Sequence, residues 1–273
     1  PQDVVVGDFN SDTWPDLAMA VYDRNAVSIL LNDQHGDFAQ PLIDIPLTPL
    51  GLGPVALLAG DFNGAGGSDL AVVNSLSSNV TILLDFAGQG FASRSTINVG
   101  PLPNNIARGD LDGDGDLDLI VTLDVSAGGA NKTLAILRNN GQGVFTADPA
   151  PPVAGNHPAG AATGFFNNDD LLDFAVADFG AYPTGGDLGD LKVFLANGNG
   201  GYPSSTACTV GFGPSAVTAA DLDGDHLTDL AVANFLSDNV TVCKGNGDGS
   251  FQAVLTLAAG SGPMDIAAED IDG

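Results

Sequence analysis

Basic residues are scarce in this sequence. Its 273 residues include 7 lysines and arginines against 34 aspartates and glutamates, for a formal net charge of −27 at pH 7. A surface that binds nucleic acid or anionic lipid needs clustered lysine and arginine, whereas bases such as Arg24, Lys132 and Lys244 are scattered. The composition therefore argues against nucleic acid and membranes as partners. So many carboxylates must be spread through solvent or neutralised by cations.

Cysteines and long apolar runs are also scarce. The two cysteines, Cys208 and Cys243, are too few for a disulfide framework, and they could either pair or remain buried thiols. No stretch approaches 18 uninterrupted apolar residues, so we expect no membrane insertion. No signal peptide is visible, although a mature chain would have lost one.

Glycine and proline are abundant, with 37 and 16 residues, and they mark a repeat. A proline followed by an apolar segment and an acidic loop recurs about every 50 residues. Each complete unit continues with an apolar run, a variable connection, a second apolar run and a Gly-rich turn that ends in an aromatic residue. The predicted units span residues 1–53, 54–102, 103–157, 158–213 and 214–262, with the truncated start of a sixth at 263–273.

The apolar runs are short, rich in Val, Ile, Leu and Ala, and bounded by Gly, Asn and Asp, which favours strands over helices. Four strands in a unit of about 50 residues are typical of a propeller blade. We therefore predict an all-β fold, a β-propeller of four-stranded blades in one domain. Because the sixth unit stops inside its acidic loop, we expect the chain to be part of a longer protein.

The third acidic loop carries the clearest candidate metal site. Carboxylates at its positions 1, 3, 5 and 9 converge if the loop curls, and the backbone carbonyl of position 7 completes the set. Hard oxygen ligands in a flexible loop suit Ca²⁺. An EF-hand is excluded, because position 12 is Val121 rather than glutamate and the flanks are predicted strands. The predicted ligands are Asp110, Asp112, Asp114, Asp116 and Asp118.

The other loops follow this spacing to different degrees. The first and fifth are complete, since an asparagine amide oxygen can replace a carboxylate. The second has Ala65 at position 5, so weaker binding is expected, and the fourth has Phe165 at position 1. The predicted ligands are Asp8, Asn10, Asp12, Trp14 and Asp16; Asp61, Asn63, Gly67 and Asp69; Asn167, Asp169 and Asp173; Asp221, Asp223, Asp225, Leu227 and Asp229; and, in the sixth loop, Asp270 and Asp272.

The pattern resembles the FG-GAP/VCBS repeat family, which forms the head of integrin α-subunits and many bacterial surface proteins. The resemblance rests on Gly-x-x-Pro steps such as Gly51–Pro54 and on the loop and turn motifs, and it covers essentially the whole chain. It implies a propeller, most often seven-bladed, with Ca²⁺ between the first two strands of each blade. It also implies that ligands meet the opposite face, made by the loops between strands 2 and 3 and between blades.

These observations favour a secreted or cell-surface module that is stabilised by calcium and binds a protein or glycan ligand, or mediates adhesion. No nucleophile motif appears, and the three histidines are better explained as loop residues. The alternatives are a propeller-based polysaccharide lyase or hydrolase, and a surface-layer or filament component that self-associates.

In the variable connections, Tyr182, Asp187 and Asp190 are candidates for ligand contacts. The Asn-x-Thr motifs at Asn79, Asn131 and Asn239 are better explained by strand chemistry than by glycosylation.

Overall fold

The computed structural model describes residues 1–38, 41–124, 133–180, 188–202 and 204–270. Within these ranges the only helices are two 3₁₀ turns, η1 (Tyr22–Arg24) and η2 (Phe235–Ser237). No helix among the described residues is long and apolar enough to cross a membrane.

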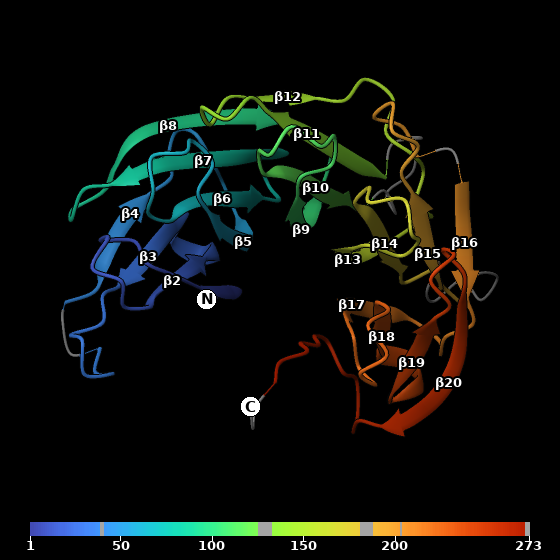
Figure 1. The fold of residues 1–273 in the computed structure, drawn as a ribbon. Coiled ribbons are helices and arrows are strands. Elements are labelled where there is room, and N and C mark those ends of the chain that lie inside the picture. The colour runs from blue at the N-terminus through green and yellow to red at the C-terminus, as the bar shows by residue number, and fades with distance from the viewer. Residues whose placement is uncertain (39–40, 125–132, 181–187, 203, 271–273) are drawn as a thin grey trace. The chain divides into compact units, whose positions relative to one another are not determined.

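The rest of the regular structure is five four-stranded sheets (Figure 1). Neighbours in each sheet are consecutive in sequence, so every sheet is an up-and-down meander drawn from one repeat. The all-β prediction with four strands per blade is thus confirmed. The first two sheets contain β1 (Asp3–Gly7), β2 (Asp16–Val21), β3 (Ala26–Leu30) and β4 (Ile43–Pro46), then β5 (Pro54–Gly60), β6 (Asp69–Asn74), β7 (Asn79–Phe86) and β8 (Phe91–Asn98).

The remaining three sheets have the same order. They contain β9 (Pro103–Gly109), β10 (Asp118–Leu123), β11 (Leu134–Asn139) and β12 (Phe145–Ala147); β13 (Pro158–Gly164), β14 (Asp173–Asp178), β15 (Asp190–Leu195) and β16 (Ser204–Cys208); and β17 (Pro214–Ala220), β18 (Asp229–Asn234), β19 (Asn239–Gly245) and β20 (Phe251–Ala258).

The second strand of each blade explains the continuous apolar runs. Every residue of β6, β10, β14 and β18 is buried, on both faces of the strand. A strand that is covered on both faces has no solvent side on which alternation would place polar residues. The apolar runs therefore mark the interior strand of a sheet that is packed between others.

The first strands also share a local irregularity. The pairing of β5, β13 and β17 with their second strands shifts by one residue just after the leading proline, between Pro54 and Ala56, Pro158 and Gly160, and Pro214 and Ala216. Proline lacks the N–H that a regular ladder needs, so a bulge at this place accommodates it. The Gly-x-x-Pro step is thus the entry into each of these blades.

The chain divides into two compact units, and the division passes through the third sheet. One unit comprises Pro1–Ile106, Gly115–Val121 and Ala135–Asp148, and the other comprises Ala107–Asp114, Thr122–Leu134 and Pro149–Gly273. Within the first unit β1 contacts β5, and within the second β13 contacts β17 and β16 contacts β20. First strands thus meet first strands, and fourth strands meet fourth strands. This is how neighbouring propeller blades pack.

Each unit has its own apolar core between adjacent sheets. In the first unit, side chains from sheets one and two, including Ile29, Leu70 and Leu83, form one buried cluster. In the second unit, Val193, Leu230 and other residues of sheets four and five form another. Burying both faces of these sheets supplies the main hydrophobic stabilisation.

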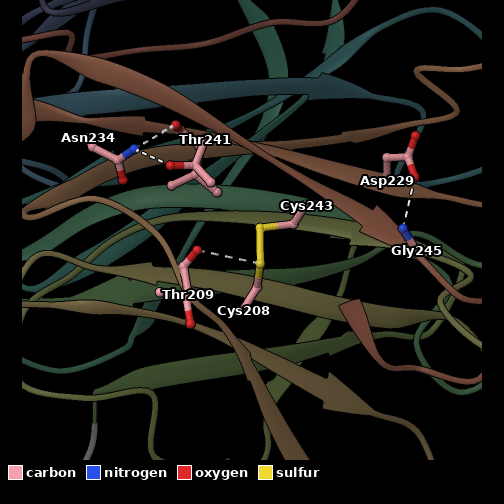
Figure 2. The surroundings of a disulfide bond; sticks show 8 residues. Cys208, Thr209, Asp229, Asn234, Thr241, Cys243 and Gly245 are labelled. Atoms are coloured by element: carbon pink, nitrogen blue, oxygen red, sulfur yellow. Dashed lines mark hydrogen bonds between the residues drawn. A yellow bond between two sulfur atoms is a disulfide. The ribbon is translucent and has the colours of Figure 1, made fainter. Parts of the chain in front are cut away.

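A disulfide joins sheets four and five (Figure 2). Cys208 ends β16 and Cys243 lies in β19, and both side chains are buried in the cluster between the two sheets. The sequence left a disulfide and two free thiols as alternatives. The structure shows the disulfide.

The Asn-x-Thr motifs of β7 and β19 have a structural role. The side-chain amide of Asn74 donates to Asn79 Oδ1 at 3.0 Å and to Thr81 Oγ1 at 2.8 Å. Asn234 bonds Asn239 and Thr241 in the same way. Strand chemistry therefore explains both motifs, as predicted, whereas Asn131 lies outside the described residues.

Candidate metal-binding loops

The acidic loops connect the first and second strands of every blade. We number them loop 1 to loop 5 in chain order, and number positions 1 to 9 within each. They span Asp8–Asp16, Asp61–Asp69, Asp110–Asp118, Phe165–Asp173 and Asp221–Asp229.

The loops curl around their own backbone amides. In loop 5 the side chain of Asp221 accepts the N–H of His226 at 2.9 Å, and that of Asp225 accepts the N–H of Leu227 at 2.9 Å. His226 at position 6 has a left-handed φ of 68°, and Thr13, Gly66, Gly115 and Asp170 at the same position are also left-handed. Aspartate and asparagine favour such turns because their short side chains bond nearby backbone groups. The curl turns the acidic side chains of positions 1, 3 and 5 inward.

The aspartate at position 9 anchors each loop to the third strand. In loop 4, Asp173 has no exposed surface. Its two carboxylate oxygens accept the N–H of Phe166 at 3.1 Å and of Ala196 at 2.8 Å. All five position-9 aspartates are buried and accept an amide just after the apolar part of strand three. The five bonds are Asp16–Asn32, Asp69–Asp85, Asp118–Asn139, Asp173–Ala196 and Asp229–Gly245.

Burial also shifts the pKa of three position-9 carboxyls. Desolvation raises the pKa of the Asp16, Asp69 and Asp173 carboxyls, against the backbone hydrogen bonds that lower it. A buried carboxylate without a nearby positive charge is disfavoured in its charged form. A cation bound in the loop would favour the charged carboxylate and so oppose this rise in pKa.

Loop 5 brings three carboxylates into one cluster. Asp221, Asp223 and Asp225 each offer an oxygen, and these atoms lie within 4.8 Å of one another. Oxygens bound to one Ca²⁺ at 2.3–2.6 Å cannot be more than about 5 Å apart, so this spacing fits the ion. The chemistry fits as well, because hard carboxylate oxygens are the ligands that Ca²⁺ prefers. Hydrogen bonds from the Leu227 and Lys244 groups lower the pKa of Asp225, which keeps it ionised.

Loop 3 forms the second such cluster among the described residues. Its members are Asp110, Asp112 and Asp118, again with one oxygen each within 4.8 Å. Here the anchor itself belongs to the group, whereas Asp229 of loop 5 does not.

Loop 1 has the same curl with one carboxylate fewer. Asp8 accepts the amides of Asp12 at 3.0 Å and Thr13 at 2.8 Å, and Asp12 accepts that of Trp14 at 2.9 Å. Asn10 stands between them at position 3, and its side-chain amide donates a hydrogen bond to Asp12 Oδ2 at 3.1 Å. Rotating this amide by half a turn would present its oxygen to an ion instead.

Loop 2 recruits a carboxylate that the sequence pattern did not indicate. Position 5 is Ala65, but Asp85, directly after the apolar part of strand three, accepts the Asn63 side-chain amide at 3.0 Å. The negative charge of Asp85 also contributes to the raised pKa of Asp69. Asp85 escaped the sequence analysis because it lies outside the repeated loop, 16 residues beyond the anchor it contacts.

Loop 4 keeps the curl without its first ligand. Asn167 and Asp169 bond each other as Asn10 and Asp12 do, but the side chain of Phe165 at position 1 is exposed. Phe165 lines a cleft of about 320 Å³ together with Asp112 and Leu172. Position 1 of loop 4 therefore holds an apolar side chain, whereas the other four loops have an aspartate at that position.

Two basic residues also contact loops 3 and 5, which have aspartate at all four of positions 1, 3, 5 and 9. The Lys244 ammonium contacts Asp223 and lies 3.1 Å from Asp225, and Arg138 lies 2.9 Å from Asp118. The sequence analysis treated Lys244 as a scattered base. No local motif links it to a loop about 20 residues earlier, and only strand pairing brings the two together.

The remaining predicted residues are placed as follows. Asp270 is described, but it belongs to no strand, and Asp272 lies outside the described residues. Tyr182 and Asp187 also lie outside them, whereas Asp190 begins β15 and stands 3.9 Å from Lys192. The predicted carbonyl ligands Trp14, Gly67, Asp116 and Leu227 all lie at position 7 of their loops.

The model of the FG-GAP-like repeat matches two segments of the chain, residues 8–72 and 166–232. These segments include loops 1, 2 and 5 and all of loop 4 except Phe165. Both segments thus carry FG-GAP-like repeats. Such repeats build β-propellers that often serve in binding or adhesion, commonly bind Ca²⁺ and are typical of extracellular proteins. The search of curated proteins found no match to this sequence.

Solved structures support the fold of these FG-GAP-like repeats. A catalytically inactive variant of virginiamycin B lyase from Staphylococcus aureus, crystallised with quinupristin, has a TM-score of 0.58 at 14% identity, covering 95% of this chain and 71% of that one. A protein of unknown function from Desulfotomaculum acetoxidans has a TM-score of 0.63 at 12% identity, covering 92% of this chain and 68% of that one. At these identities the likeness concerns the fold alone.

Proposed function

We propose that this protein is an extracellular binding or adhesion module whose blades are stabilised by Ca²⁺ in the acidic loops. The observation that carries the proposal is the clustering of Asp221, Asp223 and Asp225 at a spacing that fits one ion. The same loop stands between the first two strands of all five sheets. A bound ion would connect those strands beyond their ladder hydrogen bonds.

The electrostatics of the loops support a bound cation. Two carboxylates about 4 Å apart repel by roughly 4 kcal/mol at an effective dielectric constant of 20. The curl holds several of them close together in a chain whose formal charge is −27. A divalent ion would replace that repulsion with attraction to each ligand.

Loop 1 offers a direct test, because the single tryptophan of the chain, Trp14, stands at its position 7. Tb³⁺ has similar oxygen preferences to Ca²⁺ and emits when a nearby indole is excited. We expect Trp14-sensitised Tb³⁺ emission that Ca²⁺ quenches competitively and Mg²⁺ quenches poorly. In the Asp12→Asn variant the emission should weaken strongly. Emission that survives in an Asp8→Asn, Asp12→Asn double variant would show that Tb³⁺ binds elsewhere.

An extracellular location is supported by two features. FG-GAP-like repeats are typical of extracellular proteins, and a disulfide such as Cys208–Cys243 persists in oxidising compartments. Millimolar extracellular calcium would also saturate weak sites of this kind. Fractionation of the source cells, with thiol trapping of the two cysteines, tests the location.

The ligand in this proposal is a protein or a glycan. The connections between second and third strands vary most in sequence, and loops held on a rigid scaffold commonly carry binding specificity. A glycan array and a pull-down, each with Ca²⁺ and with EDTA, test this part. If no ligand binds in the presence of Ca²⁺, the third candidate function, a structural component, is favoured. Self-association of the purified chain tests that candidate.

A polysaccharide lyase or hydrolase is the second candidate, and the clefts beside loops 4 and 5 are where its site would lie. The cleft beside Phe165 is lined by Asp, Leu, Phe, Ala and Gly residues. A neighbouring cleft includes His226, whose side chain is 95% exposed. A general acid or base needs a positioned proton-transfer group, and these linings supply no buried histidine. Turnover of uronic-acid polymers by the purified protein would favour catalysis over binding.

A further inference from the structure

One position at the end of the third strand varies with the charge of the loop beside it. The position directly precedes the residue whose amide binds the anchor carboxylate. It is occupied by leucine beside loops 1, 2 and 4, and by a base beside loops 3 and 5. The five residues are Leu31, Leu84, Arg138, Leu195 and Lys244.

The carboxylates of the loops follow the same division. Loops 3 and 5 have aspartate at all four of positions 1, 3, 5 and 9. Loop 1 has three, and loops 2 and 4 have two each. With one divalent ion, loop 1 would carry a net charge of −1. Counted over positions 1, 3, 5 and 9, loops 3 and 5 would carry −2 without a base and −1 with it, and Asp116 at position 7 adds one further negative charge to loop 3. The base therefore accompanies the fourth carboxylate.

The contacts show where the base acts. The Lys244 ammonium bridges Asp223 and Asp225, two members of the loop 5 cluster. Arg138 reaches the buried carboxylate of Asp118, a member of the loop 3 cluster, and only 17% of the Arg138 side chain is exposed. Each base thus contacts a carboxylate of a cluster that would bind an ion.

We propose that Lys244 and Arg138 are tethered counter-ions, which hold the carboxylates of loops 5 and 3 together without metal and leave them when a divalent ion enters. The inference rests on the proposed calcium function. A leucine at this position supplies no positive charge to the loop. A base keeps the loop folded when calcium is low, and lowers its calcium affinity because the ion must displace an existing partner.

The first experiment removes the counter-ion of loop 5. In Lys244→Leu, which carries the residue found beside loops 1, 2 and 4, calcium should bind loop 5 about tenfold more tightly. The amide resonance of Gly224 reports this binding, because that amide donates to Asp221 at 2.7 Å. In EDTA the melting temperature of the variant should fall below that of the wild type. Lys192→Leu in β15 is the matched control, because it removes the same charge away from the acidic loops.

The second experiment adds a counter-ion to loop 1. Leu31 lines the same cleft as Asn10, so a lysine placed there can reach the loop. Leu31→Lys should weaken Ca²⁺ competition for Trp14-sensitised Tb³⁺ about tenfold, whereas Leu31→Met should leave it unchanged. The Met variant separates the effect of charge from that of packing.

The outcomes separate this inference from the calcium proposal. If neither wild type nor variants bind Ca²⁺, the proposed function fails. If wild type binds Ca²⁺ but Lys244→Leu changes neither the affinity of loop 5 nor the melting temperature in EDTA relative to Lys192→Leu, the counter-ion inference is overturned. A side-chain resonance of Lys244 that stays constant through the titration would equally contradict displacement.

Discussion

Loops 4 and 5 belong to the same compact unit. They share a backbone arrangement but differ in the charge of their side chains. In each, a buried position-9 aspartate accepts one amide of the loop and one at the end of the third strand. Loop 5 adds Asp221, Asp223 and Asp225, with Lys244 beside them. Loop 4 has an exposed Phe165 where loop 5 has Asp221.

The comparison separates what shapes a loop from what gives it charge. Both loops curl, although loop 4 lacks the first carboxylate, so the curl does not depend on a full ligand set. It depends on the anchor and on the turns that Asn167 and Asp169 form with their own backbone. Positions 1, 3 and 5 can then vary from blade to blade without loss of the fold.

The largest expected effect comes from releasing the two sheets from each other. Replacing Cys208 and Cys243 together by alanine removes a cross-link between residues 35 apart in sequence. This should cost about 3 kcal/mol of unfolding free energy, because the unfolded chain regains conformational freedom. Urea unfolding of the oxidised variant measures it. Reduced wild type should behave like the variant, and unfolding unaffected by either change would contradict the prediction.

The next largest effect tests the shared anchor. Asp173→Asn should cost about 2 kcal/mol, because an amide cannot accept from both Phe166 and Ala196 and leaves a buried donor unpaired. Thermal or urea unfolding in EDTA measures the loss without any contribution from metal. Asp170→Asn, the same change at an exposed position of the same loop, is the control and should cost less than about 0.5 kcal/mol. Equal losses in the two variants would refute the anchor role.

A smaller effect is expected from giving loop 4 the ligand that loop 5 has. Phe165→Asp should add calcium-dependent stabilisation, which is about 1.4 kcal/mol when Ca²⁺ is present at about 10 times its dissociation constant. Melting temperatures with Ca²⁺ and with EDTA measure the gain relative to wild type. Phe165→Asn supplies an oxygen without charge and should gain less. If the aspartate variant gains nothing, position 1 does not contribute a ligand.

The smallest effect is on pH dependence, which should have opposite signs in the two loops. Burial raises the pKa of Asp173, so its contribution to stability is present below the unfolded value near 3.8 and is lost as pH rises through the folded pKa. A backbone bond from His226 lowers the pKa of Asp221. Its contribution is therefore present above the unfolded value and lost as pH falls through the folded pKa.

Carbon-13 NMR titration of the two carboxyl groups in EDTA measures this difference directly. Asp173 should titrate at higher pH than Asp221. In Ca²⁺ the order of the two pKa values can differ, because a bound ion favours the charged form of its ligands. Identical titration curves in EDTA would contradict the assigned environments.

Much of the fold was predictable because its signals are local. The leading prolines mark the blade entries, and the apolar runs after each acidic loop mark strands that are buried on both faces. The spacing of Asp221, Asp223 and Asp225 also indicated a cluster, since a short loop brings alternate side chains to one side. The pairing of Cys208 and Cys243 stayed open, because nothing local brings residues of two different sheets together.

By itself, the sequence determined the repeat, the strands and the acidic loops, because turn chemistry and hydrophobic pattern act over a few neighbouring residues. Tertiary structure alone decided that the position-9 aspartates bind amides of the third strand, that Asp85 faces loop 2, and that Lys244 and Arg138 face loops 5 and 3. Those partners lie 16 to 23 residues apart along the chain. Only the pairing of second and third strands brings them within hydrogen-bond distance.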